Sequence, residues 1–480
     1  MSILVVDDNT MLLRKIVRSL VLAKREVHTA SSLADARVLL HSERPEVLCL
    51  DLQLPDGNGL DFLEEIRGEG ADFPVVVISG HNLPENRVRA ERLGAAVFLA
   101  KPFALSELHR LLSDLLGESP AGSAPPPPRA EPVAPARLQR AKRAYSTRRV
   151  DLADAVGLLQ EDYAPQAGDL VLARVDKLNQ HQRLELTNGR RADLYPGDEI
   201  VACYGNRYAP DQFEGEVPVD LGPCHLVAAG GIAANCLSRN SKIRAATRIT
   251  PIGVLARADG RAVNLADYGL PRRRATGERP WVTAVIGSSM NAGKTTTVAN
   301  LALGLTRAGL KVGAAKVTGT GAGGDVWHMT DAGSQRVLDF TDCGVPSTYK
   351  LSLAECESIM ETLVAELCDA GVDTILIEVA DGILQAETRG LVQSMTFFRL
   401  VDDVIFAAGD ALGAAGGVDW LRQHGCNVIG VSGALTAAPL ATRECAALVD
   451  VPLLTLDVLN GADWMPDGVR PAAANDSQIA

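Results

Sequence analysis

A proline-rich stretch in the first third of the chain limits what the sequence can fold into. Residues 119–135 run Ser-Pro-Ala-Gly-Ser-Ala-Pro-Pro-Pro-Pro-Arg-Ala-Glu-Pro-Val-Ala-Pro, and proline lacks the amide proton that helices and sheet ladders need. The 480 residues also exceed the size of one ordinary domain. We therefore expect an α/β multidomain protein that is divided by a Pro-rich and basic linker over residues 118–150.

The second half of this linker is strongly basic. Its cationic residues are Arg137, Arg140, Lys142, Arg143, Arg148 and Arg149. One interpretation is a patch for nucleic acid or a partner protein, and the other is a solvated helix that leads into the next domain. The net charge of −12 and the single interleaved aromatic residue, Tyr145, favour the solvated helix. We do not expect nucleic-acid binding.

The remaining composition is that of a cytoplasmic protein. No apolar run approaches the roughly 20 residues of a membrane span, and the N-terminus lacks the residue order of a signal peptide. The nine cysteines are scattered without disulfide or zinc spacing, so they are expected in the core. We predict no membrane partner and leave a homodimer open.

Before the linker, apolar strands alternate with amphipathic helices five times. The expected strands are 3–6, 26–30, 47–51, 74–79 and 96–99, and the helices begin near residues 10, 32, 59, 84 and 105. This order predicts a flavodoxin-like (βα)5 domain with a doubly wound parallel sheet. The polar residues at the strand ends are Asp7, Asp8, Asp51, Ser79 and Lys101. They should meet at one edge of the sheet, where open α/β sheets carry their chemistry.

Residues 1–117 resemble the receiver domain of two-component response regulators. The resemblance rests on Val6-Asp7-Asp8-Asn9, on residues 50–59 with Leu50-Asp51, on Ser79-Gly80-His81 and on Lys101-Pro102-Phe103. It implies a phosphoprotein that takes a phosphoryl group from a cognate histidine kinase or a small phosphodonor.

The resemblance also assigns roles to individual residues. Asp51 is expected to be the nucleophile that is phosphorylated. Asp7, Asp8, Asp51 and the Gln53 carbonyl are expected to hold Mg²⁺, which prefers oxygen ligands. Lys101 and Ser79 would bind the phosphoryl oxygens, and Phe98 would turn inward as the domain switches.

Residues 151–279 have a different pattern, with short β-prone runs between turn signals. The runs are 169–175, 183–186 and 199–204, and Asn188-Gly189 is a strong hairpin signal between two of them. We predict a small, mainly-β, barrel-like middle domain. The loops at 205–208 and 236–240 are interpreted as structural turns, with ligand binding as the alternative.

A phosphate-binding motif opens the region from residue 280 to 465. An apolar strand at 281–286 leads into a loop of small residues, Gly-Lys-Thr at 293–295, and a helix over 298–307. Backbone amides of such a loop and the helix N-terminus bind an anion. We expect the nucleotide to bind Gly287, Asn291, Ala292, Gly293, Lys294, Thr295 and Thr296. Lys294 would reach the β and γ phosphates and Thr295 would ligate Mg²⁺.

This α/β domain, at 281–457, resembles the P-loop family of dethiobiotin synthetase and cobyrinic acid synthase. The shared features are Gly287, one residue earlier than the strict pattern places its glycine, a strand segment at 311–319 with Lys316 at the strand end, and an acidic strand segment at 374–382. The resemblance implies that Lys316 contacts substrate and phosphate, and that Glu378 and Asp325 join the metal site, with Asp331 as the second candidate. Substrate signatures of the family are absent.

Two functions remain open at the nucleotide site. In the first, the domain is an ATPase or an ATP-dependent synthetase that transfers phosphoryl to a small molecule. In the second, nucleotide binding is a conformational switch for partner docking or assembly. Trp327 and His328 are candidates for substrate contact, and Ser432 leaves ATP against GTP unsettled. Residues 466–480 are expected to form a flexible tail.

Overall fold

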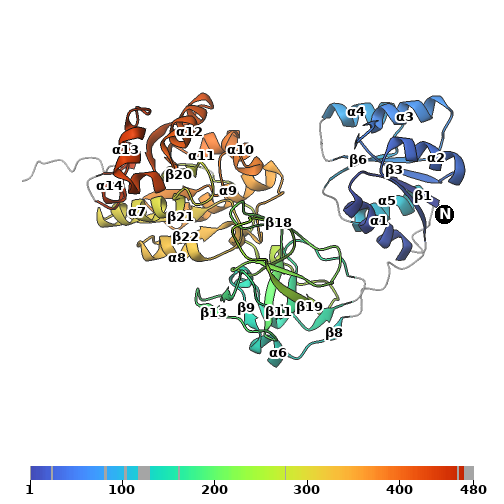
Figure 1. The fold of residues 1–480 in the computed structure, drawn as a ribbon, viewed down its shortest axis with the longest axis horizontal. Coiled ribbons are helices and arrows are strands. Elements are labelled where there is room, and N and C mark those ends of the chain that lie inside the picture. Colours follow the sequence, from blue (N-terminus) through green and yellow to red (C-terminus); the bar gives the residue numbers. More distant parts are fainter. Residues whose placement is uncertain are drawn as a thin grey trace, which may run out of the picture. The chain divides into compact units, whose positions relative to one another are not determined.

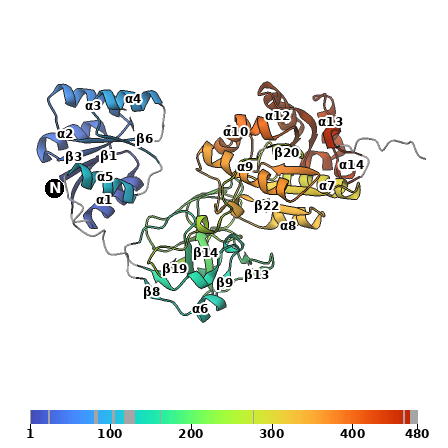
Figure 2. The same cartoon turned by 180° about the vertical axis from the view of Figure 1, so that it is seen from behind.

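The computed structural model describes residues 2–22, 25–79, 84–101, 105–116, 130–160, 163–275, 277–461 and 464–469. The chain divides into two compact units, residues 1–127 and 128–480 (Figures 1 and 2). No helix in the described part of the chain is both long and apolar enough to cross a membrane.

The first unit contains a parallel five-stranded sheet in the order β2-β1-β3-β6-β7. Its strands and helices are β1 (Ser2–Val6), α1 (Thr10–Leu22), β2 (Glu26–Ala30), α2 (Leu33–Glu43), β3 (Val47–Asp51), α3 (Gly59–Gly68), β6 (Val75–Ser79), α4 (Pro84–Arg92), β7 (Val97–Ala100) and α5 (Leu105–Leu115). Helices α1 and α5 pack on one face, and α2, α3 and α4 on the other. The flavodoxin-like prediction is confirmed, with strand bounds within one residue.

One feature of this unit was missed. A short hairpin of β4 (Gln53–Leu54) and β5 (Gly57–Asn58) follows β3 directly. Asp56 in its turn accepts hydrogen bonds from the amides of Leu33 and Ala34, at 2.8 and 2.9 Å. The hairpin thus satisfies two amides in the first turn of α2, which the local pattern of residues gives no means to foresee.

The second unit has two regions. We call residues 130–269 the β region, and its main sheet has the order β15-β16-β18-β14-β11-β19-β10-β8. Its elements are β8 (Glu131–Pro132), α6 (Pro135–Arg140), β9 (Lys142–Arg143), β10 (Gly157–Leu159), β11 (Leu170–Lys177), β12 (Arg183–Glu185), β13 (Arg191–Asp193), β14 (Glu199–Tyr204), β15 (Arg207–Tyr208), β16 (Phe213–Glu216), β17 (Cys224–Ala228), β18 (Ile232–Arg239) and β19 (Thr247–Ala256). The 3₁₀ turns η1 (Tyr145–Thr147), η2 (Leu152–Asp154) and η3 (Leu265–Tyr268) complete it.

Alternation along β11 shows why this sheet is buried on both faces. Leu170 and Leu172 pack into one apolar cluster, whereas Val171 and Ala173 pack into another. Strands β12 and β13 pair as an antiparallel hairpin around Asn188-Gly189, and Gly189 has a φ of 83°. The hairpin prediction is confirmed, because glycine adopts this left-handed conformation without steric cost.

The basic stretch that was assigned to the linker belongs instead to the β region. It forms α6, β9 and η1, and its charges pair within the protein: Arg137 with Glu199 at 2.6 Å, Lys142 with Asp198, and Arg148 with Asp342 at 2.7 Å. The predicted linker over 118–150 is therefore wrong for residues 130–150. Helix α6 is mostly exposed, which agrees with the interpretation as a solvated helix, whereas β9 and η1 pack into the β region. Residues 117–129 and 470–480 lie outside the described residues.

We call residues 281–469 the α/β region. Its parallel sheet has the order β22-β21-β23-β20-β24-β25. Its elements are β20 (Trp281–Gly287), α7 (Lys294–Arg307), β21 (Val312–Lys316), α8 (Gly324–Asp331), β22 (Arg336–Asp339), η4 (Phe340–Cys343), α9 (Leu353–Asp369), β23 (Thr374–Glu378), α10 (Ala386–Val392), α11 (Met395–Leu400), β24 (Asp403–Ala407), α12 (Ala411–Gln423), β25 (Val428–Ser432), η5 (Ala434–Ala437), α13 (Pro439–Ala446), α14 (Leu456–Asn460) and η6 (Asp467–Val469).

Helices cover both faces of this sheet. Helices α7, α8 and α14 share one apolar cluster with the sheet, and α9 to α13 share the other. Helix α7 begins at Lys294, four residues before the start expected from its apolar spacing. The first turn of α7 is polar because it faces the loop after β20, so its hydrophobic pattern starts late.

Candidate functional site

In the first unit, a lysine joins two carboxylates at the edge where the strands end. The Lys101 ammonium donates to Asp7 Oδ2 at 2.6 Å and to Asp51 Oδ2 at 2.7 Å. Burial raises the pKa of Asp7, and Lys101 opposes this effect. Burial lowers the pKa of Lys101, but its bonds to Asp51 and Asp7 outweigh burial and leave that pKa raised. The cluster is thus a pair of buried carboxylates held beside a cation.

The same edge has the oxygen ligands that a hard cation needs. Asp7, Asp8 and Asp51 offer carboxylate oxygens that lie within 4.8 Å of one another, and Asp8 is exposed. Gln53 lies two residues beyond Asp51 in β4. Three carboxylates so close together repel one another unless a cation neutralises them, so these residues fit Mg²⁺.

Backbone contacts hold Asp51 in place. The Leu52 amide donates to Asp51 Oδ1 at 2.7 Å. Gly59 packs so closely against this strand that a Cβ there would lie 2.1 Å from the Asp51 carbonyl oxygen. Ser79 is buried at the end of β6, and its carbonyl accepts the Lys101 amide at 2.7 Å. Gly80, His81, Pro102 and Phe103 lie outside the described residues, and the switch of Ser79 and Phe98 stays a prediction.

In the second unit, the loop between β20 and α7 folds around a buried lysine. Gly293 has a φ of 95° and precedes the first residue of α7, Lys294. The Lys294 ammonium donates to the Ser289 carbonyl at 2.8 Å. A Cβ on Gly287 would lie 2.8 Å from the Lys294 side chain, so glycine is required where the lysine crosses the strand end. Burial lowers the pKa of Lys294.

Four predicted site residues meet beside this lysine. The Thr295 hydroxyl lies 3.1 Å from Asp325 Oδ1 and 2.9 Å from Glu378 Oε1, and Lys316 forms an ion pair with Asp325. The structure therefore brings together Thr295, Asp325, Glu378 and Lys316, which come from α7, α8, β23 and β21. Asp331, the second candidate, is exposed at the far end of α8.

Burial sets the electrostatics of this cluster. Burial raises the pKa of Glu378, with Asp325 adding to the effect. Burial lowers the pKa of Lys316, but Asp325 and Glu378 outweigh it and leave that pKa raised. Among the described residues, Glu378 Oε2 is buried without a hydrogen-bond partner. An orphaned carboxylate oxygen next to a threonine hydroxyl and a second carboxylate fits a divalent cation.

A cavity of about 440 Å³ opens beside the cluster, and both regions of the second unit line it. Asn291, Gly293 and Thr296 line it together with Lys294 and Thr295. Ala292 is buried behind the loop. The β region supplies the opposite wall, which includes His181, Arg207 and Gln212.

Arg207 on this wall belongs to the loop at 205–208, for which a structural turn was the preferred interpretation and ligand binding the alternative. It is 5% exposed, donates to the Val227 carbonyl and to Gln212 Oε1, and forms no ion pair with any described carboxylate. Three other predicted positions lie away from the cavity lining. His328 is exposed, Trp327 donates to Glu185 at 3.0 Å, and Ser432 is fully buried with its hydroxyl 3.2 Å from that of Thr297.

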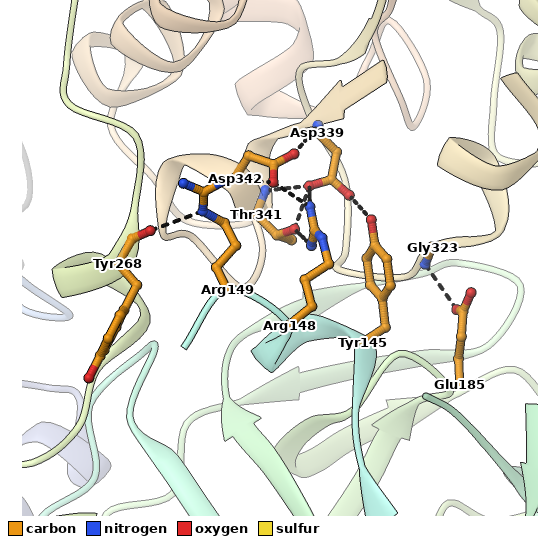
Figure 3. A network of polar contacts seen from close by, with 9 residues as sticks. All are labelled: Tyr145, Arg148, Arg149, Glu185, Tyr268, Gly323, Asp339, Thr341 and Asp342. Carbon is orange, nitrogen blue, oxygen red and sulfur yellow. Dashed lines mark hydrogen bonds and ion pairs between the residues drawn. The ribbon is translucent and has the colours of Figure 1, made fainter. Parts of the chain in front are cut away.

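A polar network fixes the β region to the α/β region (Figure 3). Arg148 donates to Asp342 at 2.7 Å and to Asp339 at 3.2 Å, and the Tyr145 hydroxyl donates to Asp339 at 2.9 Å. Arg149 pairs with Asp342 at 3.4 Å across the same interface, and within the β region it donates to the Tyr268 carbonyl at 3.0 Å. The contacts span up to 194 positions of sequence, so no local pattern signals them. They hold the wall of the cavity against the sheet that carries the lysines.

Comparison with known proteins concerns the first unit. Residues 3–113 match the family model of the response regulator receiver domain. The chain is 34% identical over 128 residues to the photosynthetic apparatus regulatory protein RegA of Cereibacter sphaeroides, covering 26% of this chain and 66% of RegA. It is 35% identical over 117 residues to the acid tolerance regulatory protein ActR of Rhizobium meliloti, with 24% and 60% covered.

A third relative is the response regulator MprA of Mycobacterium tuberculosis, with 36% identity over 114 residues, 24% of this chain and 50% of MprA. The chain thus spans between half and two thirds of the length of these curated relatives.

Proposed function

We propose that this chain, whose first unit is a response regulator receiver domain, is phosphorylated on Asp51 and uses its second unit to bind a magnesium nucleoside triphosphate. The second unit would then hydrolyse the nucleotide or transfer its γ-phosphoryl group to a small molecule in the cavity. The observation that carries this proposal is the meeting of Lys294, Thr295, Lys316 and Glu378 at one edge of a parallel sheet. ATP is the expected nucleotide, and GTP is the alternative.

The phosphates would lie on the loop of residues 287–294. The left-handed Gly293 and the N-terminus of α7 direct backbone amides toward an anion there. The Lys294 ammonium, which donates only to a neutral carbonyl among the bonds described for it, is free to exchange that carbonyl for phosphate oxygens. Such an exchange replaces a neutral acceptor by a charged one, which strengthens the hydrogen bond.

Residues at the opposite side of the phosphates would hold the metal and balance charge. Thr295, Asp325 and Glu378 would bind Mg²⁺, which supplies charge neutralisation between the β and γ phosphates. Lys316 would meet the negative charge that develops on the γ-phosphoryl oxygens. An oxygen of water or of the second substrate forms the new bond to phosphorus, and the electrons of the broken bond pass to the leaving oxygen of the diphosphate.

The receiver would act by the chemistry of an acyl phosphate. The Asp51 carboxylate would form a bond to the phosphorus of the phosphodonor, while the bond between phosphorus and the donor breaks and its electrons pass to the donor. Lys101, now bonded to Asp7 and Asp51, would bind the incoming oxygens. Asp7 and Asp8 would hold Mg²⁺ at that site. A cognate histidine kinase or a small phosphodonor is the expected partner.

A nucleotide-dependent switch without a metabolic product is the alternative for the second unit. Lys316 favours the enzyme, because a second lysine beside the cluster can stabilise the charge that develops in phosphoryl transfer. Product analysis separates the two. An ATP consumption that modifies no metabolite from a cell extract and rises only with a protein partner supports the switch.

The proposal is tested by the variant Lys294→Ala, measured by calorimetric titration with Mg-ATP and Mg-GTP. Loss of the charged hydrogen bonds should weaken nucleotide binding roughly 10- to 100-fold. Lys311→Ala is the matched control, because this lysine precedes β21 at the opposite end of the strand. Equal nucleotide affinity in wild type, Lys294→Ala and Lys311→Ala would remove the loop from the proposal.

A further inference from the structure

Glu185 belongs to the β region but makes its bonds in the α/β region. It ends β12 and is 2% exposed. Its Oε2 accepts the Gly323 amide at 2.9 Å and its Oε1 accepts the Trp327 indole N–H at 3.0 Å (the Gly323 bond is drawn in Figure 3). A carboxylate that is buried this deeply and uses both oxygens on one element is built to hold that element.

The element is α8, which carries Asp325. Gly323 is the N-cap of α8 and has no side chain with which to cap it. In a capping box a glutamate within the helix bonds the N-cap amide, whereas here a glutamate 138 positions away makes that bond. A carboxylate at this end also meets the positive pole of the helix dipole.

The geometry of one helical turn connects Glu185 to the cluster. Gly323 and Trp327 are four positions apart and therefore lie on the same face of the first turn. Asp325 lies two positions from each, which places it on the opposite face, where it bonds Lys316 and Thr295. The first turn of α8 is thus held between Glu185 on one side and the site on the other.

Packing leaves this turn no room to shift. A Cβ on Gly323 would lie within 2.7 Å of Trp327, Tyr145 and Glu185, and a Cβ on Gly189 would lie 2.7 Å from the Trp327 ring. Tyr145 meets Trp327 edge-on with ring centroids 6.1 Å apart. The β12–β13 hairpin and Tyr145 therefore enclose the start of α8 from the β region.

We propose that Glu185 is a positioning residue, which fixes the first turn of α8 so that Asp325 faces Thr295 and Lys316. It touches neither nucleotide nor metal and acts only through α8. This inference rests on the proposed nucleotide site and names the β region as the part that sets the metal affinity of that site. Without the contact, Asp325 would sample other positions and the metal would bind less tightly.

The test is Glu185→Gln in the full chain. Glutamine keeps the size of the side chain but turns one acceptor into a donor that faces an N–H group. The half-saturating Mg²⁺ concentration for ATP turnover should rise roughly tenfold. ATP binding without Mg²⁺ should stay within about twofold, since the loop that holds the phosphates is unchanged. Amide hydrogen exchange of the peptide over 323–331 should quicken roughly tenfold, without a change elsewhere in the second unit.

Two further variants serve as a control and as a second test of the role of Glu185. Glu216→Gln is the matched control, because this carboxylate of the β region pairs with Lys350 of the α/β region and does not touch α8. Trp327→Phe removes one of the two bonds and leaves the Gly323 bond, so it should show a smaller shift in the same direction and covers a failure of Glu185→Gln to fold.

The outcomes distinguish the role of Glu185 from the existence of the proposed nucleotide site. A folded Glu185→Gln protein with the Mg²⁺ dependence and the hydrogen exchange of the wild type would overturn the role of Glu185. It would leave the proposed nucleotide site standing. The same is true if Glu216→Gln changes both readouts equally, because the role of Glu185 is then general stability. A wild-type protein that binds no Mg-ATP overturns the proposed function, and this inference with it.

Discussion

The two units each place a lysine among carboxylates where parallel strands end, but they complete the site in different ways. In the receiver, Asp7, Asp51 and Lys101 all come from the strand ends of one sheet. In the second unit, the strand ends supply only Lys316 and Glu378, while Asp325 comes from a helix that the β region holds. The receiver site is complete within one sheet, and the second site depends on the fit between two regions.

The lysines of the two sites also differ in the groups to which they donate. Lys101 bridges two carboxylates and has no neutral acceptor among its described side-chain bonds. In the second unit the roles are divided, because Lys316 pairs with Asp325 whereas Lys294 donates to a carbonyl. One lysine therefore keeps the carboxylates neutralised and the other is available for the phosphates of a ligand. This division is what we expect of a site that binds a nucleotide and then stabilises transfer.

The largest effect should come from Asp51→Asn. The amide is no nucleophile, so incorporation of phosphoryl from a small phosphodonor with Mg²⁺ should be lost completely. Because the two sites share no residue, the affinity of the second unit for Mg-ATP should not change. Acid-stable, base-labile phosphate on this variant would contradict the role of Asp51. The receiver site could then no longer be compared with the second site as a phosphorylation site.

The next effect concerns the lysine that neutralises the second cluster. Lys316→Met should lower ATP turnover roughly 100- to 1,000-fold, because the variant leaves Asp325 and Glu378 without their cation and removes the charge beside the γ-phosphate. Initial rates of phosphate release measure it, with Lys311→Met as the control. Turnover within a few-fold of wild type would show that Lys316 serves stability alone and that the division between the two lysines is mistaken.

Arg148→Met tests whether the second site depends on the interface. The variant leaves Asp339 buried without a cation and Asp342 with Arg149 alone, at 3.4 Å, and breaking such a pair costs about 4 kcal/mol of unfolding free energy. Urea titration followed by tryptophan fluorescence measures the second unit alone, because all four tryptophans lie in it. Arg137→Met, whose more exposed pair with Glu199 is expected to contribute under about 1 kcal/mol, is the control. Equal losses in both variants would contradict a special role for the interface.

The same contrast explains what the sequence made predictable. The receiver residues follow apolar runs directly, so each strand pattern also locates its polar end, as at Asp51 and Lys101. Lys294, Thr295 and Glu378 were predicted in the same way, because they stand at the end of a recognisable strand or in the loop that follows one. These residues come together because parallel strands end at the same edge of a sheet. The alternation of strands and helices predicts such a sheet.

The interface was not predictable by these means. Glu185 looks like any acid of a short strand, and Arg148 like any cation of a basic stretch, until residues 138 to 194 positions away pack against them. No periodicity records such contacts, because periodicity reports only which face of an element is buried. The basic stretch was assigned to the linker for this reason. Its charge pattern is the same whether its cations face solvent, nucleic acid or buried aspartates.

The smallest effect uses pH to probe the β-region wall of the cavity. Burial, aided by the nearby Arg207, lowers the pKa of His181 from 6.5 to about 4. The folded unit therefore holds this imidazole neutral, with Nε2 2.9 Å from the Val227 carbonyl, to which it donates. A depressed folded pKa gives stability that is present above 6.5 and lost as pH falls toward 4.

The loss attributable to His181 should be about 2 kcal/mol, reduced from the full shift because the ring is partly exposed. Tryptophan-detected urea titrations across this pH range should show the difference. As the pH falls, the free energy of unfolding should drop less in His181→Gln than in the wild type, by this amount. His225, whose pKa burial also lowers, remains in both proteins and cancels in the difference. Parallel curves would mean that His181 is already open to solvent, and that the cavity wall is looser than the interface of Arg148 and Glu185 requires.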